Sequence, residues 1–228
     1  MSFHRYDRNR GTLGIEGQDR LFRSRVLVVG CGGLGGVVVE ILARAGVGML
    51  TLVDGDVFSE SNLNRQLLAR EKDIGTLKVE VAQKRVSAIN SEVQTRVIPF
   101  MLSEQNCRDF LQNVDLVIDA LDSNDARQIL YRECASAKIP VIHGALGGMI
   151  GQVGRYKPWQ KTHFDLFENP LPNQGIEKDL GTPSFTPFVI GSLEASEAIK
   201  YLAGVESVRW GTLTFIDLAM MSMETIEL

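Results

Sequence analysis

Three glycines and an acidic residue have the spacing of a phosphate-binding turn followed by a ribose-binding strand. The motif Gly30-x-Gly32-x-x-Gly35 follows a short run of valines and a leucine and precedes a helical pattern. Glycines in such turns permit a sharp bend, let the backbone approach a phosphate and allow close packing of helix on strand. A second apolar run, residues 49–53, places Asp54 about 20 residues after the last glycine, where an acidic side chain binds ribose. The pattern predicts a nucleotide-binding βαβ unit.

Two further charged residues lie where the chain enters or leaves predicted elements. Asp122 follows an apolar strand at residues 115–120, and Lys78 begins a helix whose apolar residues recur at helical spacing. In open parallel sheets, ligands bind beyond the carboxyl ends of the strands, so Asp122 is a candidate for catalysis. Taken singly, Asp122 could equally cap a strand end, and Lys78 could be an ordinary helix-entry lysine.

Strands and helices alternate along most of the chain, which predicts a parallel sheet with helices on both faces. We therefore expect an α/β fold: a Rossmann-like, doubly wound, mostly parallel sheet with an antiparallel C-terminal extension that starts near the glycine-rich stretch GALGGMIGQVGRYKP. The chain, 1–228, is expected to form one domain, with an N-terminal helical arm at about 1–25 and a proline-rich crossover loop at about 157–187. Beyond the βαβ unit and the helix from Lys78, we expect helices at 103–112, 125–137 and 188–203 and strands at 94–99, 115–120, 141–145, 212–217 and 222–228.

Composition narrows the classes of protein that fit. The 228 residues are 44% hydrophobic and 23% charged, as in ordinary globular domains. A net charge of −4 gives no general attraction to nucleic acid or to an anionic membrane, so neither partner is expected. No apolar run approaches the ~20 residues of a membrane span. The charged start MSFHRYDRNR lacks the apolar segment of a signal peptide, so we expect a cytoplasmic protein.

The cysteines and histidines are few and widely separated. No cysteine belongs to a CxxC pair, which argues against a disulfide scaffold and against a thiolate zinc site. The histidines also look isolated in sequence, so we expect packed or surface imidazoles. The residues concerned are Cys31, Cys107, Cys134, His4, His143 and His163.

Several segments together resemble one family, the ubiquitin-activating-enzyme-like adenylyltransferases of the ThiF/MoeB/HesA group. In order, these segments are RYDRN, GCGGLG, LVDGDVFSESNLNRQ, IGTLKVE, DLVIDALDS, GGMIGQV and IGSLEASEAIKYLAG. The resemblance implies binding of ATP with Mg²⁺ and adenylylation of the C-terminal glycine carboxylate of a small ubiquitin-like sulfur carrier, such as ThiS or MoaD. It also implies a homodimer, and a role in thiamine or molybdenum/tungsten cofactor biosynthesis or related sulfur transfer.

The same resemblance assigns roles to individual residues. Asp54 is similar to the acid that holds the ribose, and Asp122 to the carboxylate associated with Mg²⁺. Arg65 and Lys78 are similar to the cations on the triphosphate, and Arg8 to an arginine that crosses the dimer interface into a neighbouring ATP site. The remaining residues expected to bind the nucleotide are Gly30, Gly32, Gly33, Gly35, Asp56, Asn62 and Gln66.

The chemistry of the implied reaction fits this residue set. A carboxylate that attacks the α-phosphorus of ATP brings an anion against a polyanion, so the catalyst must neutralise charge and hold an in-line geometry. The cations Arg65, Lys78 and Arg8 and a magnesium ion at Asp122 supply the neutralisation. Since the nucleophile belongs to the substrate and is already ionised, no Ser, Cys or His nucleophile is required.

The sequence departs from many relatives in its cysteines. The crossover loop and the C-terminal tail lack the two CxxC pairs that hold a structural zinc in many relatives, so no zinc site is expected. The crossover loop also lacks the cysteine that relatives use for thioester or sulfur chemistry. We therefore expect the reaction to stop at the acyl-adenylate. Cys31, inside the glycine turn, is expected to be packed rather than reactive.

Two alternatives remain open. The pair Asp122-Ser123 resembles the branch of tRNA threonylcarbamoyladenosine dehydratases, although the acidic net charge and the C-terminal helix favour the sulfur-carrier branch. The missing cysteines also allow a catalytically inactive ATP-binding partner subunit. NAD(P)-dependent redox chemistry is less favoured, because the chain shows phosphate-binding cations but no evident acid for a hydride-transfer site.

Overall fold

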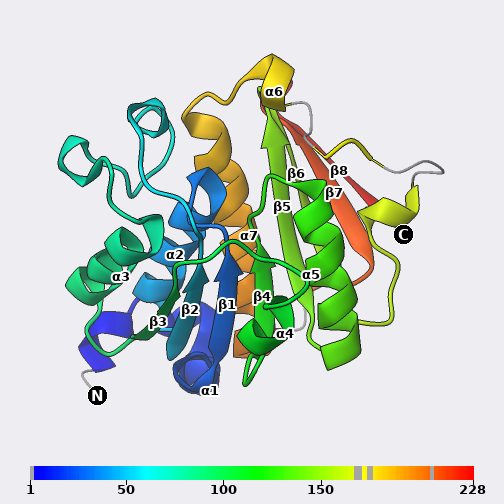
Figure 1. Cartoon of the computed structure of the whole chain (residues 1–228). Coiled ribbons are helices and arrows are strands. Elements are labelled where there is room, and N and C mark those ends of the chain that lie inside the picture. The colour runs from blue at the N-terminus through cyan, green and yellow to red at the C-terminus, as the bar shows by residue number, and fades with distance from the viewer. Residues whose placement is uncertain (1–2, 167–170, 174–176, 206–207) are drawn as a thin grey trace.

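An eight-stranded sheet organises the chain in the computed structural model, which describes residues 3–166, 171–173, 177–205 and 208–228. The strand order is β3-β2-β1-β4-β5-β6-β7-β8 (Figure 1). The strands are β1 (Arg25–Val29), β2 (Met49–Val53), β3 (Gln94–Ile98), β4 (Leu116–Asp119), β5 (Val141–Gly147), β6 (Ile150–Tyr156), β7 (Thr212–Asp217) and β8 (Ser222–Glu227). The α-helices are α1 (Arg10–Arg23), α2 (Gly33–Ala45), α3 (Lys78–Ile89), α4 (Cys107–Phe110), α5 (Asn124–Ala137), α6 (Glu177–Leu180) and α7 (Phe185–Ala203).

Helices cover both faces of the sheet because its strands bury side chains alternately on either side. Val26 and Val28 of β1 belong to a core built with α2, α3 and α7, whereas Leu27 and Val29 belong to a second core built with α4 and α5. In Figure 1, α5 lies in front of the sheet and α2 and α7 lie behind it. The predicted α/β fold with helices on both faces is confirmed.

The sheet changes direction where the glycine-rich stretch predicted it. Strands β3, β2, β1, β4 and β5 are parallel, whereas β6, β7 and β8 follow as antiparallel neighbours. The turn from β5 to β6 uses Gly148 with a φ of 58°. The antiparallel part places the two hairpin tips at the same end of the sheet, with Leu218 donating its N–H to the carbonyl of Met149.

The N-terminal arm contains a 3-10 turn and a helix. A 3-10 turn, η1 (Phe3–Tyr6), precedes α1, which bends at Gly14 where φ is 69°. Tyr6 is buried, and its hydroxyl accepts a hydrogen bond from Nδ2 of Asn90 at 2.7 Å. The arm is therefore anchored beside the C-terminal end of α3. No described helix has the length and apolar composition needed to cross a membrane.

Three local expectations differ from the structure. The helix expected at 103–112 is reduced to the single turn of α4. Helix α7 begins at Phe185 rather than at 188, because a proline in the first helical turn costs no hydrogen bond and Pro187 lies there. The expected crossover loop, 157–187, contains a 3-10 turn, η4 (His163–Leu166), and α6; its residues 167–170 and 174–176 lie outside the described chain.

The histidines of β5 and η4 are packed, as expected, but they are not isolated. The rings of His143 and His163 stack with centroids 4.2 Å apart, and both side chains are buried. Tertiary packing brings together two residues that are 20 positions apart in sequence, which no local pattern reveals. Burial lowers the pKa of His163 to about 2 and also lowers the pKa of His143, so both imidazoles are neutral in the folded protein.

Candidate active site at the carboxyl ends of the parallel strands

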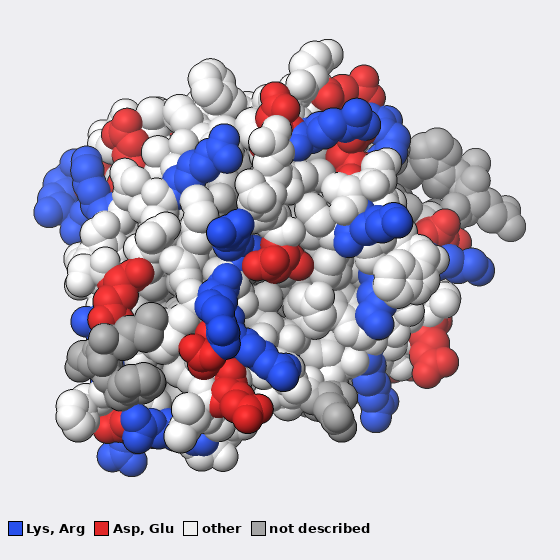
Figure 2. Space-filling model, turned by 90° about the horizontal axis from the view of Figure 1, so that it is seen from below, with Lys and Arg blue, Asp and Glu red and all other residues white. Residues whose placement is uncertain are grey.

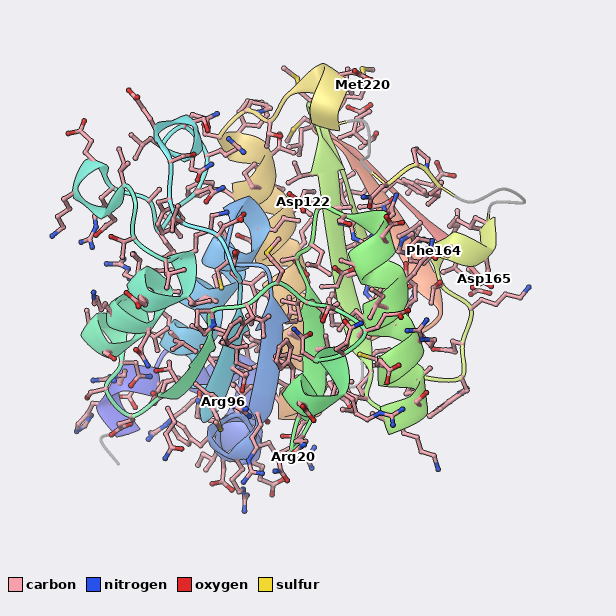
Figure 3. All side chains as sticks on the ribbon, viewed as in Figure 1. Arg20, Arg96, Asp122, Phe164, Asp165 and Met220 are labelled. Atoms are coloured by element: carbon pink, nitrogen blue, oxygen red, sulfur yellow. The ribbon has the colours of Figure 1, made fainter. Side chains whose placement is uncertain are left out.

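A pocket of about 470 Å³ opens where β1, β2 and β4 end. Its lining includes Val29, Val53 and Ala120, the residues at or just beyond the carboxyl ends of these strands. The volume lies in the range of small-molecule sites, and the position is where open α/β sheets bind ligands. Figure 3 shows Asp122 near this end of the sheet, whereas Arg20 of α1 lies at the opposite end.

The glycine turn forms one wall of the pocket. Gly30 has a φ of 96°, and a Cβ there would lie 2.5 Å from the carbonyl oxygen of Ala120. A Cβ on Gly35 would overlap the carbonyl oxygen of Gly30, so this glycine brings α2 against β1 rather than lining the pocket. Gly32 precedes α2 without a side-chain cap, and both Gly32 and Gly33 line the pocket. The open N–H groups of this helix N-terminus favour an anion.

Asp54 closes the turn from β2. Its two carboxylate oxygens accept the backbone N–H groups of Cys31 and Asp56, each at 2.8 Å. Burial raises the pKa of Asp54, an effect that nearby Lys78 and these two hydrogen bonds oppose. Asp54 and Asp56 both line the pocket. The acidic side chain is thus fixed against the glycine turn.

Lys78 and Arg65 bring two cations to the pocket. Nζ of Lys78 lies 2.9 Å from Oδ2 of Asp56, and the lysine side chain is only 9% exposed. Arg65 donates from Nη1 to the carbonyl of Ser61 and to Oδ1 of Asn64, at 2.8 and 2.9 Å, and forms no ion pair with the described residues. Arg65 therefore keeps its full charge available to a phosphate, whereas Lys78 shares its charge with Asp56.

Gln66 lies beside the glycine turn with an unsatisfied acceptor. The side chain is buried, and its Oε1 has no hydrogen-bond partner among the described residues. Its amide lies 3.5 Å from the position that a Cβ on Gly32 would occupy. Because a buried unpaired amide oxygen is costly, Gln66 is suited to accept a hydrogen bond from a ligand.

Asn62 and Arg8 lie outside the pocket lining. Asn62 is buried, and its Oδ1 accepts the N–H of Ser59 at 3.0 Å in a capping box, which shapes the turn before Arg65. Arg8 is exposed on the arm, next to the Tyr6 anchor at the end of α3, whereas Lys78 begins that helix. A 12-residue helix spans about 18 Å, so Arg8 lies far from the pocket of its own chain.

The arginine-rich arm does not produce a uniformly basic surface at this end of the molecule. Figure 2 shows Asp and Glu side chains among the Lys and Arg side chains on the face opposite the pocket. Arg23, for example, pairs with Asp19 on the same helix. The arm therefore presents mixed charges on this face.

Several pocket residues were not anticipated. Phe100 and Met101, each 63% exposed, supply an apolar side of the pocket just after β3. Two polar side chains also line the pocket: Arg127 from α5, next to the Asp122 loop, and Asn173 from the crossover loop. The available signal for Arg127 was its spacing from Leu130 and Cys134, which places all three on the buried face of α5. Asn173 had no such signal, because its contacts are long-range.

Asn173 joins the crossover loop to the segment that carries Asp122. The hydroxyl of Ser123 donates to Oδ1 of Asn173 at 2.7 Å, and the N–H of Asn124 donates to its carbonyl at 2.9 Å. Ser123 also caps α5 by accepting the N–H of Ala126. Asp122 itself is exposed in the pocket and forms no hydrogen bond or ion pair with the described residues.

The described residues contain no group of three or more His, Cys, Asp or Glu side chains arranged to hold a metal ion. Magnesium does not require such a group, because it usually binds through one or two carboxylates together with substrate phosphates and water. An exposed, unpaired carboxylate at Asp122, in a pocket with phosphate-binding features, fits that mode.

The fold and the pocket define a class: Rossmann-like α/β proteins with an anion-binding glycine turn at the carboxyl ends of their strands. Within this class, the chain belongs to the ThiF family, whose family model matches residues 6–228. The similarity covers every element from the Tyr6 anchor to β8.

Relatives and solved structures agree with this assignment. The chain is 36% identical over 217 residues to the SAMP-activating enzyme E1 of Haloferax volcanii, covering 94% of this chain and 80% of that protein. It is 36% identical over 216 residues to the sulfur carrier protein adenylyltransferase of Thermus thermophilus, covering 90% and 79%. It is 35% identical over 221 residues to the molybdopterin-synthase adenylyltransferase of Haemophilus influenzae, covering 95% and 90%. The crystal structure of E. coli MccB with MccA-N7isoASN has the same fold, with a TM-score of 0.87 and 23% identity over 100% of this chain and 72% of that one.

Proposed function

We propose that this protein is an adenylyltransferase that uses ATP to activate the C-terminal glycine carboxylate of a ubiquitin-like sulfur carrier protein. The observation that carries the proposal is the joint placement of the open α2 N-terminus, Lys78 and Asp122 around one pocket of a ThiF-family chain. Relatives named sulfur carrier protein adenylyltransferase and molybdopterin-synthase adenylyltransferase support the carrier as substrate.

In this reaction a carrier carboxylate oxygen attacks the α-phosphorus of ATP. The new O–P bond forms as the bond between the α-phosphorus and the bridging oxygen breaks, and that bond's electron pair leaves with pyrophosphate. Asp54 would accept the ribose hydroxyls. Lys78, Arg65 and the N–H groups at the start of α2 would neutralise the phosphates, which otherwise repel the approaching carboxylate.

Asp122 would hold Mg²⁺ together with the phosphates, and the ion would add positive charge where the leaving pyrophosphate develops negative charge. Cys31 has no place in this chemistry. It is buried, and burial raises the pKa of its thiol, so it stays protonated. Since the crossover loop contains no cysteine, the reaction would end at the acyl-adenylate.

The exposed position of Arg8, remote from its own pocket, is what a residue serving a second copy of the chain would require. We propose that the protein acts as a homodimer in which Arg8 of each copy contacts the triphosphate bound by the other. The buried Tyr6, two residues earlier, fixes the start of the arm and so limits the range of positions available to Arg8.

The decisive experiment is exchange of labelled pyrophosphate into ATP by purified protein with Mg²⁺, in the presence of carriers that end in Gly-Gly. Exchange that depends on one ThiS-like or MoaD-like carrier is the expected result. Stimulation by modified tRNA and not by any carrier would instead favour the dehydratase alternative suggested by the Asp122-Ser123 pair. ATP binding without exchange under every condition would identify an inactive partner subunit.

A further inference from the structure

A network of charged and polar side chains lies buried beneath the loop that presents Asp122. Asp119, the last residue of β4, is fully buried, and its Oδ2 accepts hydrogen bonds from Tyr131 at 2.6 Å and His143 at 2.8 Å. Its Oδ1 accepts the N–H of Leu121 at 3.2 Å. Arg127 on α5 forms an ion pair with the same carboxylate, with Nε 3.4 Å from Oδ2. None of these residues is used in the proposed reaction.

Arg127 reaches the chain on both sides of Asp122. One terminal nitrogen, Nη2, donates to the carbonyl of Leu121, the residue before Asp122, and to the carbonyl of Gly144 at 3.3 Å. The other, Nη1, donates to Oδ1 of Asn124, two residues after Asp122, at 3.2 Å. The side chain is only 9% exposed. The planar guanidinium thus connects the Asp122 loop to β5 through several bonds of fixed geometry.

Asp119 neutralises the positive charge of the Arg127 guanidinium, so Asp122 is not needed for this purpose. Burial raises the pKa of Asp119, but the charge of Arg127 and the hydrogen bonds from His143 and Tyr131 together outweigh burial and hold this pKa well below its usual range, so the carboxylate is ionised. Because Nδ1 of His143 donates to Asp119, its Nε2 accepts from the Gln152 amide, 3.0 Å away, as a neutral imidazole does. Asp122 is therefore left to interact with a ligand.

We propose that Arg127 is a positioning residue that clamps the chain on both sides of Asp122, at the Leu121 carbonyl and the Asn124 side chain, and so holds the Asp122 carboxylate towards the magnesium-bound phosphates of the nucleotide. The proposal rests on the adenylyltransferase function inferred above. It predicts that Arg127 acts through the loop: without the clamp, the Asp122 carboxylate samples positions outside the pocket, and a higher concentration of Mg²⁺ is needed to recruit the ion.

The test compares Arg127→Lys and Arg127→Gln with wild type. The lysine variant keeps the positive charge beside Asp119 but cannot form the paired hydrogen bonds to Leu121 and Asn124. It keeps the test valid if the neutral Arg127→Gln variant does not fold. The control is Arg132→Gln on the outer face of the same helix, where the arginine pairs with exposed Glu104. Three quantities are measured: hydrogen exchange of the Leu121 and Asn124 amides without ligand, the Mg²⁺ concentration for half-maximal pyrophosphate exchange, and kcat with KM for ATP.

The expected result is a loss of amide protection confined to residues 120–126, a raised Mg²⁺ requirement and a roughly 10–100-fold fall in kcat, with a smaller change in KM for ATP. The lysine variant should be intermediate, and the control should match wild type. Normal protection of the loop amides and an unchanged Mg²⁺ requirement would overturn the proposal. A variant in which only the melting temperature falls would also overturn it, because Arg127 would then have a purely structural role.

The amide measurement requires no activity, so it separates this proposal from the function on which it rests. If wild-type protein fails to exchange pyrophosphate while the Arg127 variants lose loop protection, the clamp stands and the proposed reaction is wrong. If wild type exchanges pyrophosphate and the Arg127→Lys loop keeps its protection, the reaction stands and the clamp is wrong.

Discussion

At the scale of single residues, opposing charges hold the candidate phosphate-binding groups in place before any ligand arrives. Lys78 is nearly buried, and its ammonium group pairs with Asp56, while Asp54 receives two backbone N–H groups. Burying a charge without a partner is costly, so Asp56 stabilises Lys78 in the empty pocket. A polyphosphate offers a stronger partner than one half-exposed carboxylate, so a bound nucleotide would draw Lys78 away from Asp56.

Replacement of Lys78 by Met should remove the proposed phosphate contact while keeping the length of the side chain. We expect kcat/KM for pyrophosphate exchange to fall roughly 100-fold, as when one positioned donor to a developing charge is lost. The matched control is Lys84→Met, because Lys84 is exposed on the same helix and lies outside the pocket lining. Equal activity of the two variants would remove Lys78 from the site.

Asp122→Asn tests the carboxylate that has no partner in the empty pocket. The substitution preserves shape and removes the charge that Mg²⁺ requires, so exchange should fall roughly 100-fold or more with the melting temperature little changed. Asp109→Asn, on the exposed surface of α4, provides the control. Mg²⁺-dependent exchange at the wild-type rate in Asp122→Asn would show that the ion is held elsewhere.

At the scale of elements, α7 contacts β5 closely through a buried acid. A Cβ on Gly144 would lie 2.5 Å from Oε2 of Glu194, and neither carboxyl oxygen has a hydrogen-bond partner among the described residues. Burial raises the pKa of Glu194 well above its usual value, and nearby Asp119 raises it further. The carboxyl group is therefore protonated in the folded protein. This acid is tolerated because protonation removes its charge.

Stability should consequently fall as the pH rises. In the unfolded chain Glu194 ionises above its ordinary pKa of ~4.3, whereas in the folded chain the raised pKa keeps it protonated. Between the unfolded and the folded pKa, unfolding therefore releases a proton. This group lowers the free energy of unfolding by about 1.4 kcal/mol per pH unit within that window. Glu194→Gln should remove this slope, measured as the difference between urea unfolding at pH 5 and at pH 7.5.

The control for this prediction lies one turn further along α7. Glu197 pairs with Arg155 and Lys200, and these partners lower its pKa although burial opposes them. Glu197→Gln should therefore destabilise the protein at neutral pH, where the ionised carboxylate contributes to stability. A pH slope in Glu194→Gln that equals the wild-type slope would show that Glu194 is ionised in the fold.

At the scale of the whole molecule, the arm and the pocket lie at opposite ends of the sheet (Figure 1). A site that needs Arg8 is therefore complete only when a second copy supplies the arginine. Arg8→Ala should lower exchange without unfolding the chain, because Tyr6 rather than Arg8 anchors the arm.

Subunit complementation tests this arrangement directly. Co-expression of Arg8→Ala and Asp122→Asn chains gives mixed dimers in which one of the two sites has both residues intact. If the site is shared, such a random mixture should recover about a quarter of wild-type activity, although each variant alone is impaired. A mixture no more active than the average of its two variants would place Arg8 and Asp122 within one chain, or would remove Arg8 from the site.

The amino-acid sequence by itself determined the glycine turn and the elements next to it. Apolar periodicity is a local property, and it placed β1, α2, β2 and the start of α3 within a residue of their observed positions. The spacing of Gly30, Gly32 and Asp54 likewise predicted residues that the structure brings to one pocket. Resemblance to the ThiF family added Arg65 and Gln66, which line it too.

Only the tertiary structure decided which distant residues meet. The stacked rings of His143 and His163, the contact of Asn173 with the Asp122 loop, and the guanidinium of Arg127 between Leu121 and Asn124 all join separate elements. Sequence spacing carries no information on such contacts, because they depend on strand order and on how α5 packs against the sheet. The buried network of Asp119, Arg127, Tyr131 and His143 next to the Asp122 loop therefore could be identified only from the tertiary structure.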